Sequence, residues 1–229
     1  MFWNIIKLNL LFCLFALPSG LFFMLGIITP LGIIATVMSL IAAFPIGGAY
    51  CSCLFGLSKM IRRDSGYLWY DFKRKYKENY KQAAVPGILC TLFVYVQLFL
   101  WVGVINNGMN LGWVLAGLVP LIIFGMVVPY IFLQISYIEL GIGSILKNSL
   151  ILSFANIGRS FISSLANGAI WVVFALFFPE SLPYSPLLLV FGFSVSWFLS
   201  LLCIWPPVNK QHAIEETLRR QSEENLPTE

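Results

Sequence analysis

The chain has 229 residues, of which 59% are hydrophobic and 10% are charged, and its formal net charge is +4. Soluble domains carry about 25% charged residues, so this composition excludes a domain folded around an aqueous core and predicts an integral membrane protein. The positive charge does not indicate nucleic-acid binding, because the basic residues flank apolar stretches. It favours anionic lipid headgroups as partners.

Six apolar stretches are long enough to cross a bilayer, which takes about 20 residues. They lie near residues 5–26, 31–57, 84–105, 112–138, 160–178 and 186–205. The expected fold is therefore an all-α integral membrane protein. Residues 1–205 form a single bundle of six spans, and residues 206–229 form a polar cytoplasmic tail.

Two arrangements stay open for residues 1–44: two full spans, or a broken or re-entrant hairpin. Only Ile28, Thr29 and Pro30 separate the first two apolar runs. The first run continues past Pro18 without an A-x-A cleavage site, which predicts an uncleaved span and not a signal peptide. Pro18 and Pro45 are expected to kink these spans.

The connection between the second and third spans is the most basic part of the chain. Residues 59–82 hold eight of the fourteen Lys and Arg. Within residues 68–82 aromatic side chains recur every four positions, which predicts an amphipathic helix at the cytoplasmic headgroup level. Docking on another protein is the alternative. The candidate docking residues are Trp69, Asp71, Phe72, Lys73, Arg74, Lys75, Tyr76, Lys77, Asn79, Tyr80 and Lys81.

Two further cytoplasmic segments are expected. Residues 139–159 are less charged and predict a short amphipathic connection between the fourth and fifth spans. The tail begins after Trp205-Pro206-Pro207 and contains the pairs Glu215/Arg219 and Glu216/Arg220. Their i,i+4 spacing predicts a solvated helix. His212, the single histidine, is expected to be a surface residue.

The distribution of basic residues predicts the topology. With the amino terminus inside, all fourteen Lys and Arg lie on the cytoplasmic side, as the positive-inside rule requires. The expected outer connections, residues 106–110 and 179–185, contain none, and Trp101 and Trp113 bracket the first of them. The prediction is a multi-pass protein of the cytoplasmic (plasma) membrane with both termini inside.

Few polar groups lie inside the expected spans. Gln97, Gln134 and Asn167 are the most polar, and because none is ionisable they argue against a proton-coupled pump. Hydrogen bonding between helices and contact with a substrate are the two open roles. Stripes of small residues favour close packing within the bundle over a dimer interface. They are Gly48, Ser52 and Gly56 in the second span, and Ser160, Ser164 and Gly168 in the fifth.

No sequence pattern indicates an enzyme. The phosphate-binding GxxxxGKS/T, HExxH and GxSxG motifs are absent, so we expect neither a catalytic site nor a cofactor. Five cysteines, Cys13, Cys51, Cys53, Cys90 and Cys203, all lie in apolar segments, which argues against a disulfide framework or a metal site.

In residues 45–83, a proline and small residues lead into a short charged turn, and an aromatic-basic segment follows. The last part of this pattern comprises Asp71, Phe72, Tyr76, Lys77, Asn79, Tyr80, Lys81, Gln82 and Ala83. The pattern resembles the signature region of the YesL-like bacterial membrane proteins. Asn9-Leu10-Leu11 before Pro18 is also similar to the family's opening, and the second half of the chain matches in its span pattern.

This resemblance implies a Gram-positive-type membrane protein encoded beside carbohydrate importers of the ATP-binding-cassette kind, in a family without an established activity. The first hypothesis is a non-enzymatic accessory or regulatory subunit of such an importer, with permease subunits or further copies of the chain as partners. The second is a transporter of small neutral solutes that uses Gln97, Gln134 and Asn167.

Overall fold

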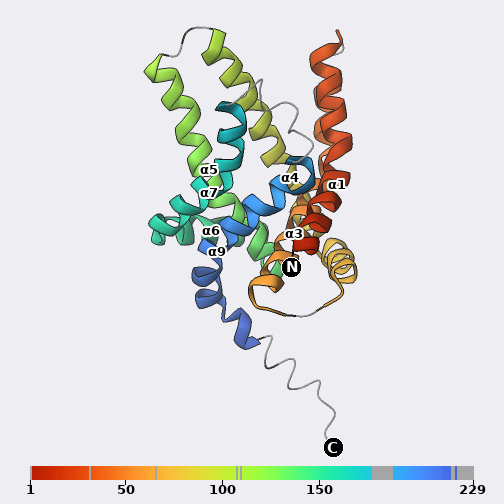
Figure 1. The fold of residues 1–229 in the computed structure, drawn as a ribbon, viewed down its shortest axis with the longest axis vertical. Coiled ribbons are helices and arrows are strands. Elements are labelled where there is room, and N and C mark those ends of the chain that lie inside the picture. Colours follow the sequence, from red (N-terminus) through yellow and green to blue (C-terminus); the bar gives the residue numbers. More distant parts are fainter. Residues whose placement is uncertain are drawn as a thin grey trace, which may run out of the picture.

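The computed structural model describes residues 2–30, 32–64, 66–106, 108, 110–176, 188–217 and 220. This part of the chain is helical and contains no strand, which confirms the all-α prediction. The helices are α1 (Phe2–Ile28), α2 (Gly32–Ala42), α3 (Phe44–Ile61), α4 (Leu68–Asn106), α5 (Leu111–Tyr137), α6 (Ile142–Ala155), α7 (Ile157–Leu176), the short π-helix η2 (Leu188–Gly192) and α9 (Phe193–His212) (Figure 1).

Several helices are long and apolar enough to cross a membrane. Four pass this test on their own: α1, α4, α5 and the segment Val190–His212. Two bent pairs, α2 with α3 and α6 with α7, raise the number to six if each pair is one span. Length and composition therefore indicate a multi-pass membrane protein with between four and six spans.

The buried core surrounds α3. Every residue of α3 from Gly47 to Ser58 is buried, and α1, α4, α5 and α9 pack against this helix. The fully buried side chains of the core include Leu8, Leu54, Leu57, Tyr130, Phe132, Leu201 and Ile204. By contrast, α1, α2 and the apolar half of α4 expose many large hydrophobic side chains, as expected of surfaces that contact lipid.

Proline positions account for one of the breaks. Pro45 lies in the first turn of α3, and the chain bends by 40° between α2 and α3, so the expected kink at Pro45 is confirmed. α1 instead continues as one helix through Pro18. The expected span at residues 31–57 is therefore two helices that meet at Ala43.

The expected surface helix and third span are one continuous helix. α4 has 39 residues, which corresponds to a length of about 58 Å, nearly twice the thickness of the hydrocarbon core of a bilayer. Its basic first turns and its apolar later turns run in different directions (Figure 1), and Pro86 lies between them. The amphipathic segment 68–82 is thus one end of a spanning helix and not an independent element.

Among the described glycines, the tightest contact with a neighbouring backbone occurs where α3 crosses α4. A Cβ atom on Gly47 would lie 1.9 Å from the carbonyl oxygen of Ala83, and one on Gly87 would lie 2.7 Å from Cα of Gly47. Only glycine fits at both positions, because the obstructing atoms belong to the backbone. The small-residue pattern in the sequence pointed to the neighbouring Gly48 and missed this pair.

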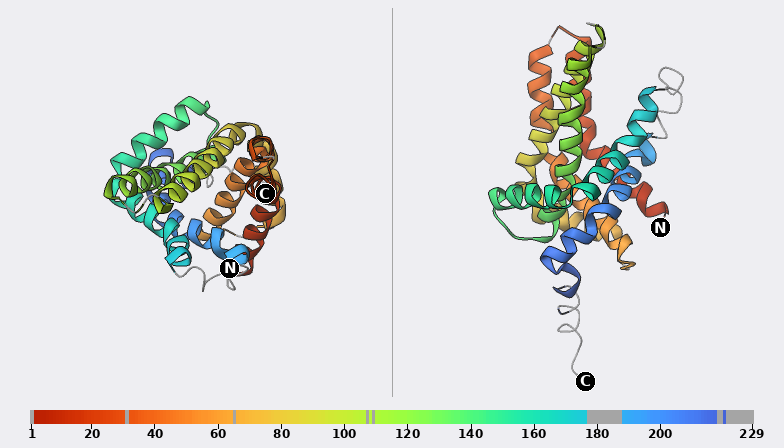
Figure 2. Two further views of the ribbon diagram at one scale, coloured as in Figure 1. Left: turned by 90° about the horizontal axis from the view of Figure 1, so that it is seen from above. Right: turned by 90° about the vertical axis from the view of Figure 1, so that its left-hand side faces the viewer.

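The expected connection at residues 139–159 contains α6 and the first turn of α7, which meet near Asn156 at an angle of 100°. α6 lies across the other helices (Figure 2, right). Its buried residues, Ile145, Ser149, Leu152 and Ser153, share one face, in agreement with the amphipathic prediction.

The last helix extends further than the sequence indicated. α9 continues through Pro206 and Pro207 to His212, where Ala213, with φ of 46°, ends it. The prediction that the polar tail begins at residue 206 was therefore wrong, because α9 ends only at His212. His212 is half-buried. Arg219 of the expected Glu215/Arg219 pair and the whole of the second expected outer connection, residues 179–185, lie outside the described residues.

The crossing of α3 and α4 gives a stability prediction. Gly47→Ala should lower the free energy of unfolding by at least about 3 kcal/mol, because backbone atoms cannot move aside as a side chain can. Gly20→Ala is the control, since a Cβ there meets no atom within 4 Å, and it should be neutral or stabilise by up to about 1 kcal/mol. Unfolding of the purified protein by sodium dodecyl sulfate measures both. Equal stability of the two variants would contradict the packing described.

Candidate functional site

The three amides predicted inside the spans lie on three different helices and do not form one site. Gln97 lies on α4, nine residues before its end at Asn106, whereas Gln134 lies on α5, 23 residues after its start at Leu111. At 1.5 Å per residue their levels along this hairpin differ by about 20 Å. Asn167 is half-buried on α7, and no hydrogen bond joins the three among the described residues.

Gln134 belongs to a buried polar network between α5, α6 and α7. Its Nε2 donates to Oγ of Ser149 at 3.0 Å, and one turn earlier the Tyr130 hydroxyl lies 3.1 Å from Oγ of Ser160. Ser160 Oγ donates to the carbonyl oxygen of Ser153 at 2.9 Å. These bonds hold the bend between α6 and α7 against α5. Within the described residues, Gln134 Oε1 and Ser153 Oγ have no hydrogen-bond partner.

The small residues of α7 face two neighbouring helices. Ser164 Oγ donates to the backbone carbonyl of Ile122 on α5 at 3.0 Å. It lies opposite Gly125, where an added Cβ atom would come within 2.4 Å of Ser164 Oγ. Ser163, which the small-residue pattern did not include, lies 2.6 Å from Oγ of Ser200 on α9. A Cβ on Gly168 would meet no described atom within 4 Å, so Gly168 makes no close helix contact there.

The small residues of α3 contact α1 and α4. A Cβ on Gly48 would lie 3.0 Å from the ring of Tyr76, and one on Gly56 would lie 3.0 Å from Leu8. Ser52 donates to the carbonyl oxygen of Gly48 at 2.8 Å and stays within its own helix. The stripe thus serves packing within the chain.

A second polar cluster, which the sequence did not indicate, joins α1, α2 and α4. Ser19 and Ser39 each donate to the other's backbone carbonyl, at 2.9 and 2.7 Å, and the Tyr95 hydroxyl lies 3.0 Å from Ser19 Oγ. The ring of Phe23 stacks on Tyr95 with centroids 4.0 Å apart. Isolated serines in apolar spans are common, so nothing in the sequence singled out this pair.

The basic end of the molecule contains a compact ion-pair cluster. Lys59 Nζ lies 2.7 Å from Oδ2 of Asp71, and the two side chains are only 15% and 11% exposed. Asp71 also faces Arg74 at 3.6 Å, and Lys59 faces Asp64 at 3.8 Å. Lys59 lies in the last turn of α3 and Asp71 in the first turn of α4, where each charge also complements the helix dipole. The pair therefore fixes the turn between these helices.

A second cation at this end is enclosed by aromatic rings. The Arg62 guanidinium lies 5.7 Å from the ring centroid of Tyr137 and 5.5 Å from that of Trp205, and it donates to the Tyr137 hydroxyl at 3.1 Å. Trp205 Nε1 in turn donates to Glu215. Arg62 thus connects the ends of α3, α5 and α9, which is a structural role.

The predicted aromatic stripe of residues 68–82 faces the bundle. The ring of Phe15 on α1 lies 4.8 Å from that of Tyr76 and 6.0 Å from that of Phe72, centroid to centroid, and Phe44 lies 6.3 Å from Tyr80. Phe72 is buried and Asp71 is held by Lys59. These residues stabilise the fold, and a docking role can fall only on the side chains that stay exposed.

The exposed part of this segment forms a continuous basic and aromatic surface. Trp69 and Tyr70 are 57% and 63% exposed, and Lys73, Lys77 and Lys81 follow them at the surface. We call these five residues the outer face of α4. Arg74 and Lys75 flank it and pair with Glu78, and Asn79 donates to the backbone of its own helix.

A polar pocket of about 400 Å³ lies between the first half of α4 and the end of α5. Lys75, Glu78 and Asn79 line one wall, and Ser136 and Glu139 line the other. Glu139 is exposed in this wall. The pocket contains hydrogen-bond donors and acceptors but no arrangement of a nucleophile with a base.

Metal binding finds no support in the described residues. They contain no group of three or more His, Cys, Asp and Glu side chains that could hold a metal ion. Cys51, Cys53, Cys90 and Cys203 are free thiols, and Cys51 and Cys53 are buried in α3.

Comparison with protein-family models, with curated proteins and with solved structures finds no match to this chain. The resemblance of residues 45–83 to the YesL-like proteins therefore stays a hypothesis that rests on the sequence alone.

The Lys59–Asp71 pair predicts a measurable coupling. Asp71→Asn should lower the free energy of unfolding by about 2 kcal/mol, because it leaves the half-buried ammonium of Lys59 without its close partner. The exchange of both charges, Lys59→Asp with Asp71→Lys, should restore part of the lost stability. The recovery is incomplete because each exchanged charge now interacts unfavourably with the dipole of its own helix. Lys73→Gln on the exposed face is the control and should change stability by less than about 0.5 kcal/mol. A double-mutant cycle without coupling would contradict the contact.

Proposed function

We propose that this chain is a non-enzymatic accessory or regulatory membrane subunit of a carbohydrate importer of the ATP-binding-cassette kind. The observation that carries the proposal is the outer face of α4. Its inner side is fixed to α1 and α3 by Phe72, Tyr76 and the Lys59–Asp71 pair, so Trp69, Tyr70 and the lysines form a preformed surface. A rigid aromatic and basic surface suits binding to a protein, because little conformational entropy is lost on association.

The polar groups inside the helices support this assignment over chemistry in the membrane. Gln134 is hydrogen-bonded within the α5–α6–α7 network, Ser19 and Ser39 pair with each other, and the three amides lie on separate helices. The carbohydrate part of the proposal rests on the resemblance of residues 45–83 to the YesL-like proteins.

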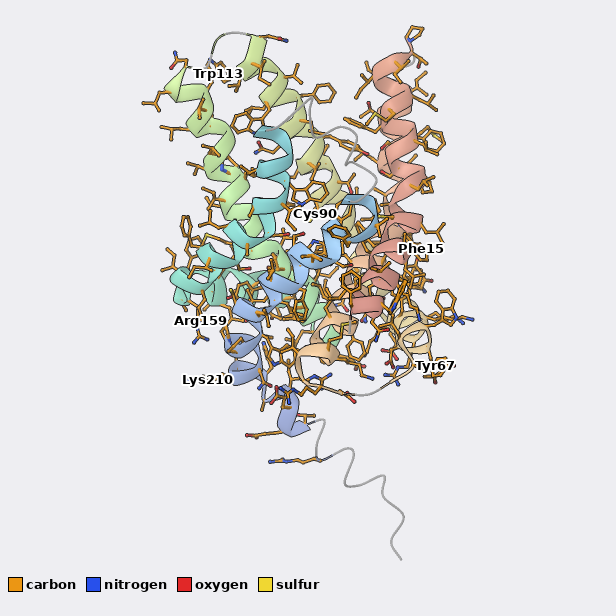
Figure 3. The ribbon with its side chains drawn as sticks, in the orientation of Figure 1. Phe15, Tyr67, Cys90, Trp113, Arg159 and Lys210 are labelled. Atoms are coloured by element: carbon orange, nitrogen blue, oxygen red, sulfur yellow. The ribbon has the colours of Figure 1, made fainter. Side chains whose placement is uncertain are left out.

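The proposed topology has six spans with both termini in the cytoplasm of a plasma membrane. It is supported by the positions of the labelled residues in Figure 3, where Trp113 lies at one end of the molecule and Tyr67, Arg159 and Lys210 lie toward the other. The bent pair α2–α3 then serves as one span, whereas α7 crosses the membrane after the cytoplasmic connection that contains α6.

Cysteine labelling tests this topology. In a variant without the five native cysteines, Asn106→Cys should react with a membrane-impermeant maleimide added to intact cells, and Lys210→Cys should react only after the cells are opened. Both positions are exposed, so accessibility within the fold does not limit either reaction. Reaction of Lys210→Cys in intact cells would contradict the proposed orientation.

A transporter for small neutral solutes is the second candidate, and two observations favour it. The helix pairs α2–α3 and α6–α7 are bent by 40° and 100°, and discontinuous helices often form substrate sites in transporters. Gln97 Oε1 and Gln134 Oε1 are buried without a partner among the described residues, so each could accept a hydrogen bond from a solute.

Uptake measurements separate the two candidates. In a strain that lacks the gene, a surface set (Trp69→Ser, Lys73→Ala and Lys77→Ala) should reduce uptake of labelled sugar several-fold at equal membrane expression. An amide set (Gln97→Leu, Gln134→Leu and Asn167→Leu) should leave it within about twofold, because hydrogen bonds between membrane helices contribute only about 0.6 kcal/mol each. Lys210→Ala is the control for loss of positive charge elsewhere. Loss of uptake confined to the amide set would contradict the accessory role and support the transporter.

A further inference from the structure

The structure contains a second, larger surface groove, which the proposed function does not use. It lies between the first half of α1 and the residues that lead into α4, and its volume is about 620 Å³. Asn4, Lys7, Leu10 and Leu14 form the wall on α1, and Tyr67 and Trp69 form the opposite wall. In Figure 3, Tyr67 lies at the end of the molecule away from Trp113.

The charge of this groove is positive. Lys7 is exposed and has no ion-pair partner among the described residues, and none of the residues that line the groove is acidic. The acids nearest in sequence to the second wall are engaged elsewhere, since Asp71 contacts Lys59 and Asp64 lies close to Lys59 and Arg62. The amine of Lys7 is therefore available to an anion from outside the chain.

The apolar part of the groove continues into a lipid-facing row on the same helix. Leu10, Leu14, Leu17 and Leu21 are 50%, 65%, 54% and 58% exposed, and their spacing places them with Lys7 on one face of α1. The distance from Leu10 to Leu21 along the helix is about 16 Å. Half of the hydrocarbon core of a bilayer is about 15 Å thick, so this row has the length of one leaflet.

Aromatic side chains line the same groove as the lysine. Tyr67 and Trp69 are both exposed at the rim of the groove, and such residues concentrate where acyl chains meet headgroups. The order along the groove is thus a cation with aromatic rings, followed by an apolar row one leaflet long. This order matches a phospholipid, with its phosphate at Lys7 and an acyl chain beside the leucines.

We propose that the groove between α1 and the start of α4 is a binding site for one anionic phospholipid of the cytoplasmic leaflet. Lys7 contacts the phosphate, Asn4 offers a hydrogen bond to the headgroup, and Leu10 and Leu14 contact the first part of an acyl chain. The site shares Trp69 with the outer face of α4, but its cation and its apolar row lie on α1, so the proposal stands whether or not the chain serves an importer.

Native mass spectrometry of the full chain tests this site. After exchange into mixed micelles, the protein should retain phosphatidylglycerol in preference to phosphatidylcholine. Lys7→Gln should lower retention of phosphatidylglycerol about fivefold, as expected for about 1 kcal/mol per lysine near an anionic surface. Lys210→Gln, an exposed lysine outside the groove, is the matched control and should retain the lipid as the unchanged protein does.

A second variant and a soluble competitor test whether binding needs the acyl chain of the lipid as well as its headgroup. Leu14→Asn keeps the cation but interrupts the apolar row, and it should also lower retention, because an amide replaces apolar surface in contact with the chain. Glycerophosphoglycerol, which has the headgroup without acyl chains, should not displace the lipid at millimolar concentration. Equal retention by Lys7→Gln and Lys210→Gln, or displacement by the soluble headgroup, would overturn the proposal.

Discussion

The contact of Gly47 with Gly87 and Ala83 is the constraint on which the arrangement of the other helices depends. Because neither glycine has a side chain, the backbones of α3 and α4 touch, and the two helices then run side by side toward the basic end of the molecule. This brings Gly48 against Tyr76 and places Lys59 opposite Asp71. A residue with a Cβ at position 47 would force α3 and α4 apart. It would thereby disrupt the contacts of Gly48 with Tyr76 and of Lys59 with Asp71.

Packing of one side of α4 against the bundle also fixes the position and the rigidity of its exposed side. Phe72 and Tyr76 contact Phe15 on α1, so the amphipathic segment is held at a fixed angle and its basic outer face becomes a rigid surface. The same crossing positions Tyr67 and Trp69 beside α1 and thereby forms the groove at Lys7. Two surfaces of different chemistry follow from one helix crossing, and we propose a protein partner for one and a lipid for the other.

Polar groups in the interior serve mainly to hold bends. The bend between α6 and α7 is held by Tyr130, Gln134 and Ser160, and α1 is joined to α2 by Ser19 and Ser39. Lipid offers no hydrogen bonds, so each bend needs such partners inside the protein. Four buried side-chain oxygens lack a partner among the described residues: Gln97 Oε1, Gln134 Oε1, Ser153 Oγ and Ser194 Oγ. The two glutamine oxygens among them are the physical basis for the alternative proposal of a transport role.

The sequence by itself determined that the protein belongs in a membrane, that it is helical and where most of its apolar stretches lie. Hydropathy and periodicity suffice for this because they are local properties of the chain. It also indicated the amphipathic segment 68–82 and the break at Pro45. It did not reveal that this segment continues into α4, that α9 passes Pro206 and Pro207, or that Gly47 and not Gly48 makes the closest contact. Only the tertiary structure decided these points, and it also placed Phe72 inside and Trp69 outside. Which face of a helix is buried, and which of two adjacent glycines meets a neighbour, depends on residues far apart in the chain.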